Sequence, residues 1–176
     1  MLAHSRCCAR AVLKHDAAVE NSPDPALLEE ALRRLPHGRD FRFLDALEQL
    51  EPGKSGTARY TVRGDEPFLA AHFPGRPMLP GVILVEAIAQ LGGVVCQCDP
   101  AHAPLADLRL TAIRKAKILG AAVPGDGLRI HVTIEGRMAG LVQVTGNVHA
   151  STTPGQESLL ASATVSLSGA SPPSEV

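Results

Sequence analysis

The sequence lacks an excess of charge of either sign. Its 176 residues include 17 Lys and Arg against 18 Asp and Glu, so the formal net charge is -1. This balance argues against a nucleic-acid-binding protein and against a polybasic protein of the membrane surface. Any charged partner must therefore be met by a local patch. The length predicts about one domain, large enough to bury a core.

Cysteine is scarce, and its four residues form two near-adjacent pairs, Cys7 with Cys8 and Cys96 with Cys98. Such spacing matches no zinc knuckle, CxxC redox motif or disulfide framework. We therefore expect reduced thiols and no metal site. Residues 1–22 show no periodicity, and we interpret them as a disordered leader.

The chain also lacks an uninterrupted apolar run. The first twenty residues carry charges throughout, with no apolar segment typical of a secretory signal. Residues 78–96 approach the length of a membrane span, but a central carboxylate, Glu86, is costly in lipid. We therefore expect a cytoplasmic protein without a membrane span.

The N-terminal half begins with a predicted short helix. Asp24 and Pro25 supply an N-cap and a first-turn proline, and the following apolar stripe ends at Pro36. Residues 41–56 then read as a strand that turns at Pro52-Gly53, and residues 58–64 read as another strand.

Alternation is clearest downstream of residue 127. GLRIHVTIEG, LVQVTGNVHA and LLASATVSL each place apolar residues at every second position, as in half-buried antiparallel strands. Residues 105–123 mix this alternation with a basic cluster, and we predict two strand pieces around a bend. Residues 169–176 are interpreted as a disordered tail, which leaves residues 23–168 as a single domain.

Residues 80–97 are the one long helical candidate. They are apolar nearly all the way round, and such a helix must be surrounded by protein. The strands are the material available to surround it. The sequence therefore predicts an α+β fold in which a curled antiparallel sheet encloses a central helix.

Glu86 is the only charged residue between Pro77 and Cys98, and Gln90 lies one turn later on the same helix face. A buried carboxylate must be paired, hydrogen-bonded or protonated. One interpretation is a structural pair or cap; the other is a general acid near neutral pH. Burial alone leaves both open.

The loop before this helix favours a catalytic role for Glu86. His72 lies among several prolines and glycines that fix the geometry of the loop, and a histidine can act as a base near pH 7. The free N-H groups at the helix start, around Gly81 and Val82, can bind a carbonyl oxygen. Base, acid and oxyanion donors are thus close in sequence, although a lone loop histidine is usually just a surface residue.

HFPGRPMLPGVILVEAIAQ, residues 72–90, closely resembles the signature of the 3-hydroxyacyl-[acyl carrier protein] dehydratases of type II fatty acid synthesis, which have the hotdog fold. LPHGRDFRFLDAL at 35–47 and AKILGAAVPGD at 116–126 extend the likeness. Departures include Ala71 where the family usually has Gly, and Ile118, Leu119 and Gly120 where it has aromatic and basic residues.

The resemblance implies removal of water from a (3R)-3-hydroxyacyl thioester to give the trans-2-enoyl product, without metal or cofactor. His72 matches the histidine that takes the C2 proton, and Glu86 the carboxylate that protonates the departing hydroxyl. Gly81 matches the glycine whose N-H binds the thioester carbonyl, and Gln90 a glutamine that orients the site. The remaining expected substrate contacts are Phe73, Pro80 and Val82.

The resemblance also implies a homodimer, with His from one chain and Glu from the other, and dimers that can assemble into hexamers. The expected partner is an acidic acyl carrier protein that bears the 3-hydroxyacyl chain. Basic residues near the tunnel mouth are candidates for docking it: Arg76, Arg109, Arg114, Lys115 and Lys117. For each of them, a solvated charge that protects a strand edge is an equally good interpretation.

Two rival functions remain open from the sequence. An acyl-thioesterase of the same fold would use a carboxylate to activate water, but it would not need the HFPG loop. A non-catalytic subunit that binds acyl chains or the carrier protein would not need both His72 and Glu86. Some relatives of the dehydratases also isomerise the enoyl product, and the sequence leaves that activity open.

Overall fold

The computed structural model describes residues 24–153 and 156–171. The helices are α1 (Pro25–Leu32) and α2 (Gly81–Gln97), and short 3-10 turns lie at Arg39–Phe41, before the first strand, and at Leu69–Ala71, before α2. The strands are β1 (Ala46–Glu51), β2 (Ser55–Thr61), β3 (Ala106–Ile118), β4 (Gly127–Met138), β5 (Leu141–Thr153) and β6 (Gln156–Ala170). The expected leader, residues 1–22, lies outside the described residues.

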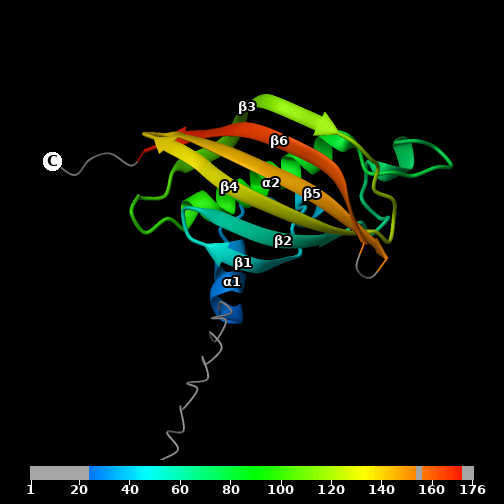
Figure 1. The fold of residues 1–176 in the computed structure, drawn as a ribbon, viewed down its shortest axis with the longest axis horizontal. Helices are drawn as coiled ribbons and strands as arrows, with labels where there is room; N and C mark the ends of the chain where they lie inside the picture. Colours follow the sequence, from blue (N-terminus) through cyan, green and yellow to red (C-terminus); the bar gives the residue numbers. More distant parts are fainter. Residues whose placement is uncertain (1–23, 154–155, 172–176) are drawn as a thin grey trace, which may run out of the picture.

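The six strands form one antiparallel sheet in the order β1-β2-β4-β5-β6-β3. The sheet curls around α2, as Figure 1 shows, and this is the predicted hotdog architecture. The register brings apolar partners together on the inner face, for example Ile130 beside Val148 and Val144 beside Val165. All four side chains are fully buried. The alternation in the sequence therefore marks the concave side of the sheet correctly.

Helix α1 begins at Pro25, as the sequence predicted, but it ends at Leu32, four residues before the predicted end at Pro36. The Asp24 carboxylate accepts a hydrogen bond from the N-H of Ala26, and Pro25 occupies the first helical position. Ala31 and Leu32, in the last turn, are buried. The segment after α1 is thereby anchored to the core before it reaches the central helix.

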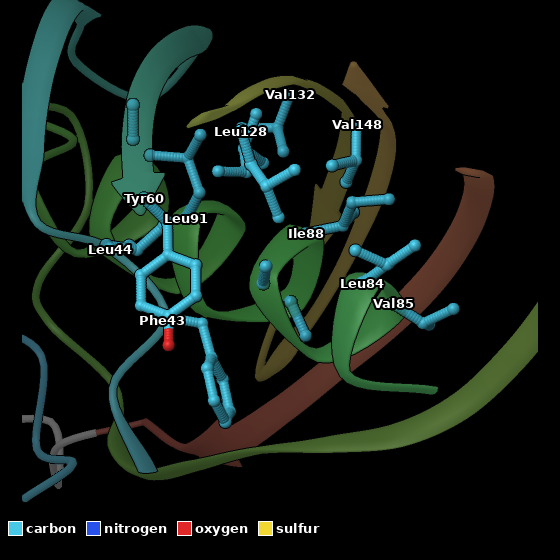
Figure 2. Packing of buried hydrophobic residues seen from close by; sticks show 14 of the residues in the cluster. Phe43, Leu44, Tyr60, Leu84, Val85, Ile88, Leu91, Leu128, Val132 and Val148 are labelled. Atoms are coloured by element: carbon cyan, nitrogen blue, oxygen red, sulfur yellow. The ribbon is translucent and has the colours of Figure 1, made fainter. Parts of the chain in front are cut away.

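Helix α2 is held by its packing. Its many Val and Ile residues have modest helix propensity, so tertiary contacts must supply most of the stability. Figure 2 shows Leu84, Ile88 and Leu91 of α2 among strand residues such as Val132 and Val148. Burial of each large aliphatic side chain is worth roughly 1.5–3 kcal/mol.

One side of α2 is left open by the sheet of this chain. Val82 is 67% exposed, and Glu86, Gly93 and Gln97 are half-buried. These positions share one helix face because they are four, seven and four residues apart. The sheet of this chain therefore leaves one stripe of the central helix uncovered, where small and polar residues stand beside the exposed Val82.

Two expectations at the sheet edge need correction. Residues 106–118 form the single strand β3, although two pieces around a bend were predicted; bulges absorb the irregular alternation while pairing with β6 continues. Strand β6 includes Gly169 and Ala170, which were assigned to the tail, because Gly169 stays bonded to Gly140. Neither described helix is long and apolar enough to cross a membrane.

Candidate active site

Glu86 lies in the second turn of α2, at the edge of a cavity of about 610 Å³. Its side chain keeps 19% of its surface exposed, so it is accessible at the cavity and not sealed in the core. On the helix side, the cavity follows the open stripe of α2 from Glu86 past Ala89 and Gly93 to Gln97. The lining also includes Leu105, directly before β3, and Leu108 and Leu110 at the start of β3. We call this space the α2 cavity.

The α2 cavity is lined by aliphatic side chains, such as Val94 and Leu108, and by polar ones, including Glu86 and Gln97. Eleven residues separate Glu86 from Gln97, which is about 16 Å along a helix. Both hydrogen bonds of the Gln97 amide go to the backbone of Leu105, each at 2.8 Å. The far end is thereby fixed in shape. A slender aliphatic chain matches these dimensions and this lining.

Gln90 is fully buried and holds Glu86 in place. Its amide Nε2 donates to the Glu86 Oε1 at 3.0 Å and to the carbonyl oxygen of Phe41 at 2.9 Å. Its Oε1 accepts from the N-H of Phe43 at 3.0 Å. The polar atoms of the Gln90 amide are thus engaged. The carboxylate is thereby tied to the segment that follows α1.

His37 also approaches the carboxylate. Its Nε2 lies 3.5 Å from the Glu86 Oε1, and its side chain is 31% exposed at the wall of the α2 cavity. The other ring nitrogen, Nδ1, is buried and has no hydrogen-bond partner among the described residues. The Oε1 of Glu86 therefore faces two nitrogen atoms, one from Gln90 and one from His37.

His72 follows the 3-10 turn Leu69–Ala71 and is held by the backbone of its own loop. Its Nδ1 lies 2.9 Å from the Met78 carbonyl oxygen, and the Met78 N-H donates to the His72 carbonyl. A carbonyl only accepts, so Nδ1 carries the proton in the neutral ring and Nε2 keeps a free lone pair. That tautomer is suited to a general base.

The start of α2 presents free backbone donors. Its N-cap, Pro80, makes no side-chain cap, and the first N-H groups of a helix have no acceptor within it. A Cβ built on Gly81 would lie 2.6 Å from the Ile118 Cδ1, so only glycine fits without a shift. The expected donors at Gly81 and Val82 are thus at the surface, beside β3.

Within the part of the chain that the structure describes, His72 does not line the α2 cavity, so the two expected catalytic side chains border different surfaces. Phe73 is 54% exposed. The basic candidates are all exposed: Arg76 lies in the loop, and Arg109, Arg114, Lys115 and Lys117 lie on β3. Of these, Arg109 borders the α2 cavity. No cluster of three metal-ligating side chains occurs among the described residues.

Comparison with known proteins places this chain in a family. The model of the FabA-like domain matches residues 35–154. The chain belongs to the FabA-like family. A 3-hydroxyacyl-[acyl-carrier-protein] dehydratase FabZ from Dechloromonas aromatica is 37% identical over 114 residues, which are 64% of this chain and 79% of that protein. The FabZ of Syntrophotalea carbinolica is 33% identical, over 68% of this chain and 82% of its own.

Solved structures agree on the fold of this FabA-like chain. A chain of the dehydratase heterocomplex ApeI:P from Xenorhabdus doucetiae superposes with a TM-score of 0.64 at 20% identity, covering 79% of this chain and 90% of that one. Zebra fish thioesterase superfamily member 2 superposes with a TM-score of 0.58 at 11% identity, covering 80% and 93%. At such identities, these structures support the hotdog fold alone.

Sequence reasoning missed three residues of the site: His37, Gly93 and Gln97. His37 stands 49 residues before Glu86 in the chain, and only its place in the LPHG motif gave a signal. Gly93 and Gln97 could have been predicted from the sequence, because they lie seven and eleven residues after Glu86 and therefore on its helix face. Extending the Glu86 and Gln90 face along α2 would have found them.

Proposed function

We propose that this FabA-like chain is a hydro-lyase that dehydrates (3R)-3-hydroxyacyl-[acyl carrier protein] to trans-2-enoyl-[acyl carrier protein] in fatty acid biosynthesis, with His72 as base and Glu86 as acid. The observation that carries this proposal is the accessible Glu86 carboxyl at the edge of a cavity that is lined in part by aliphatic side chains. The FabZ relatives are named for this reaction. A general acid next to a cavity for an acyl chain is what the reaction requires.

The proton balance is simple. His72 Nε2 takes the proton from C2, and the electrons of that bond form the C2=C3 double bond. The C3-O bond breaks as the Glu86 carboxyl donates its proton to the leaving hydroxyl, and water departs. The N-H groups of Gly81 and Val82 stabilise the charge that develops on the thioester oxygen. Transfer of the proton from His72 back to Glu86 through solvent completes the cycle.

The complete site requires a second copy of the chain. His72 and Glu86 border different surfaces. Ile118 lies beside Gly81 at the start of α2, and large apolar side chains are exposed in the loop of His72, in α2 and in or next to β3: Phe73, Val82, Ile113, Ile118 and Leu119. Among the described strands, β3 pairs with β6 alone, and its other edge offers a place for a partner. A homodimer that covers this surface brings the His72 of one subunit to the Glu86 of the other. Assembly of these dimers into hexamers is part of the same proposal.

The α2 cavity holds the acyl chain in this proposal. The thioester and its carrier protein remain outside, where Arg76 and the basic side chains of β3 can meet acidic groups. We place the protein in the cytoplasm, because a reducing compartment suits the unpaired thiols of Cys96 and Cys98. Burial raises the pKa of the Cys96 thiol to about 11, so this thiol is inert.

The direct test is mass spectrometry of a 3-hydroxyacyl carrier protein incubated with the purified protein. We expect loss of one water with the wild type, and no loss with His72→Ala or Glu86→Gln. Loss of the whole acyl group would favour a thioesterase instead. An unchanged substrate at every chain length, or unaffected rates in both variants, would overturn the proposal.

The shared site has its own test. Co-assembled His72→Ala and Glu86→Gln subunits contain one site with both defects and one with neither, provided that His and Glu come from different chains. We therefore expect such mixed dimers to recover up to about half of the wild-type activity. If both residues of a site belonged to the same chain, each site would keep a defect and no activity would return.

A further inference from the structure

The proposed mechanism assigns no role to His37, although this residue lies beside Glu86. It lies after the buried Leu35 and the rigid Pro36, and its ring is 6.0 Å from that of Phe41. The backbone and the neighbouring ring therefore restrict where the imidazole can point. The atom that it points at is the Glu86 Oε1, 3.5 Å from the His37 Nε2.

The burial of one ring nitrogen of His37 decides which nitrogen carries the proton. Its Nδ1 is closed off from solvent and has no partner among the described residues. An N-H group at that position would be buried without an acceptor, at a cost of about 1–3 kcal/mol. The neutral ring therefore places its hydrogen on Nε2, and this N-H faces the carboxyl group.

The two oxygens of Glu86 are thereby distinguished. Oε1 faces the N-H of His37 and accepts from Gln90 at 3.0 Å, while no hydrogen bond to Oε2 occurs among the described residues. An oxygen that faces two donors cannot also carry a proton without losing one of them. The acidic proton therefore belongs on Oε2, which is left for the substrate.

We propose that His37 is a positioning residue, whose Nε2-H, together with Gln90, holds the Glu86 Oε1 so that the acidic proton stays on Oε2 and faces the 3-hydroxyl of the substrate. This inference rests on the proposed dehydration. At 3.5 Å the contact is long for a hydrogen bond. It tightens when Glu86 gives up its proton and becomes an anion, so His37 contributes most in the transition state.

Three variants test this role. His37→Phe keeps a ring of similar size and removes the N-H; His37→Gln keeps an N-H donor on a flexible chain. His149→Phe, at a half-buried position of β5 whose ring makes no hydrogen bond among the described residues, is the matched control. Each is measured for kcat and KM in dehydration, for binding of a saturated acyl-pantetheine thioester, and for thermal unfolding.

We expect kcat of His37→Phe to fall about a hundredfold, as for other small displacements of a reacting group, with KM, thioester binding and unfolding temperature unchanged. His37→Gln should recover most of that loss, and His149→Phe should equal the wild type. A full-rate His37→Phe would overturn the inference, as would equal losses in both His37 variants or a loss matched by weaker binding or folding. A wild type that removes no water would instead overturn the proposed function.

Discussion

Two carboxylates of this chain, Glu86 and Glu66, differ in how many of their oxygens are hydrogen-bonded and in how exposed they are. Glu66 is only 2% exposed, and both of its oxygens accept hydrogen bonds: Oε1 from the Tyr60 hydroxyl and the Arg63 N-H, Oε2 from the Gly64 N-H. Glu86 is held through one oxygen, and the other is left at a cavity. Both oxygens of Glu66 are therefore engaged in hydrogen bonds within the fold, whereas Glu86 keeps one oxygen that can interact with a ligand.

The difference teaches how burial and function separate. Burial alone would raise the pKa of the Glu66 carboxyl, but hydrogen bonds from Tyr60 and from backbone N-H groups hold that pKa below its ordinary value. Such a group stays ionised and closes the turn after β2. A carboxylate that must give and take a proton instead needs one oxygen without a fixed donor, and Glu86 has that arrangement.

The largest expected effect separates the two residues by activity. Glu86→Gln should lower kcat on the order of 10²–10⁴-fold, because a general acid is lost. Its unfolding free energy should change by less than about 0.5 kcal/mol, since the amide oxygen can still accept from Gln90. Steady-state kinetics and urea unfolding check both values. Substantial activity in this variant would place Glu86 among the structural residues, beside Glu66.

Glu66→Ala should produce the reverse pattern. It leaves the Tyr60 hydroxyl and the N-H groups of Arg63 and Gly64 without their acceptor, at about 1–3 kcal/mol for a buried group. We expect a loss of about 3 kcal/mol in unfolding free energy, measured by urea denaturation, with kcat retained below the transition. Tyr60→Phe is the milder control, at about 1 kcal/mol. A stable Glu66→Ala protein would contradict this assignment.

The pH dependence of stability sharpens the same contrast. The folded pKa of Glu66 lies below its ordinary value of 4.5, so its contribution is present above pH 4.5 and is lost as the pH falls through the folded pKa. The difference in unfolding free energy between wild type and Glu66→Gln should therefore be constant above pH 4.5 and shrink below it. A difference that grew with acidification would have the wrong sign for this account.

Two adjacent glycines of α2 show a similar contrast between a position packed in the core and a position at the cavity. A Cβ on Gly92 would lie 2.8 Å from the side chain of Val144, whereas one on Gly93 would meet only the Leu108 Cδ2 at 3.7 Å. Gly92→Ala should cost about 1–3 kcal/mol in stability through overpacking. Gly93→Ala should gain up to about 1 kcal/mol from helix propensity. Thermal unfolding distinguishes them, and equal effects would refute the comparison.

Gly93 also allows a test of the cavity. Gly93→Leu should shift the preference of the enzyme toward shorter acyl chains, because the new side chain fills the space beside Leu108. Competition between short and long 3-hydroxyacyl substrates measures this shift. An unchanged preference would mean that the acyl chain lies elsewhere.

The smallest effect is expected at the exposed charges of β3. Lys115→Glu and Lys117→Glu should raise KM a few-fold for substrate on the carrier protein, and salt should reduce the difference. The same variants should leave KM for an acyl-pantetheine thioester unchanged. An equal rise for both substrates would argue against docking at β3.

Sequence patterns predicted the parts of this fold that depend on local periodicity. The Pro-Gly start and the apolar run predicted α2, and strict alternation predicted β4, β5 and β6. Strand β3 was misjudged because its bulges break the period of two while the backbone pairing continues. The catalytic roles of His72 and Glu86 stay a prediction.

Contacts between distant segments were outside the reach of any pattern. Gln90 was singled out for its helix face, but its bonds to Phe41 and Phe43 join residues more than forty positions apart. The contact between His37 and Glu86 is of the same kind. Glu66 was not noticed at all, because a Glu in a polar turn looks solvated until the Tyr60 hydroxyl is seen beside it.

The Gln90 amide couples the reacting carboxyl to the ordering of the backbone at Phe41 and Phe43. Coupling of this kind is reciprocal: whatever steadies Glu86 must, by the same free energy, steady the segment between α1 and β1. The rate at which the Phe43 amide hydrogen exchanges with deuterated solvent therefore reports on how firmly Glu86 is held. The measurement is made on a backbone atom that no substrate touches. Its protection should rise when an acyl chain fills the cavity.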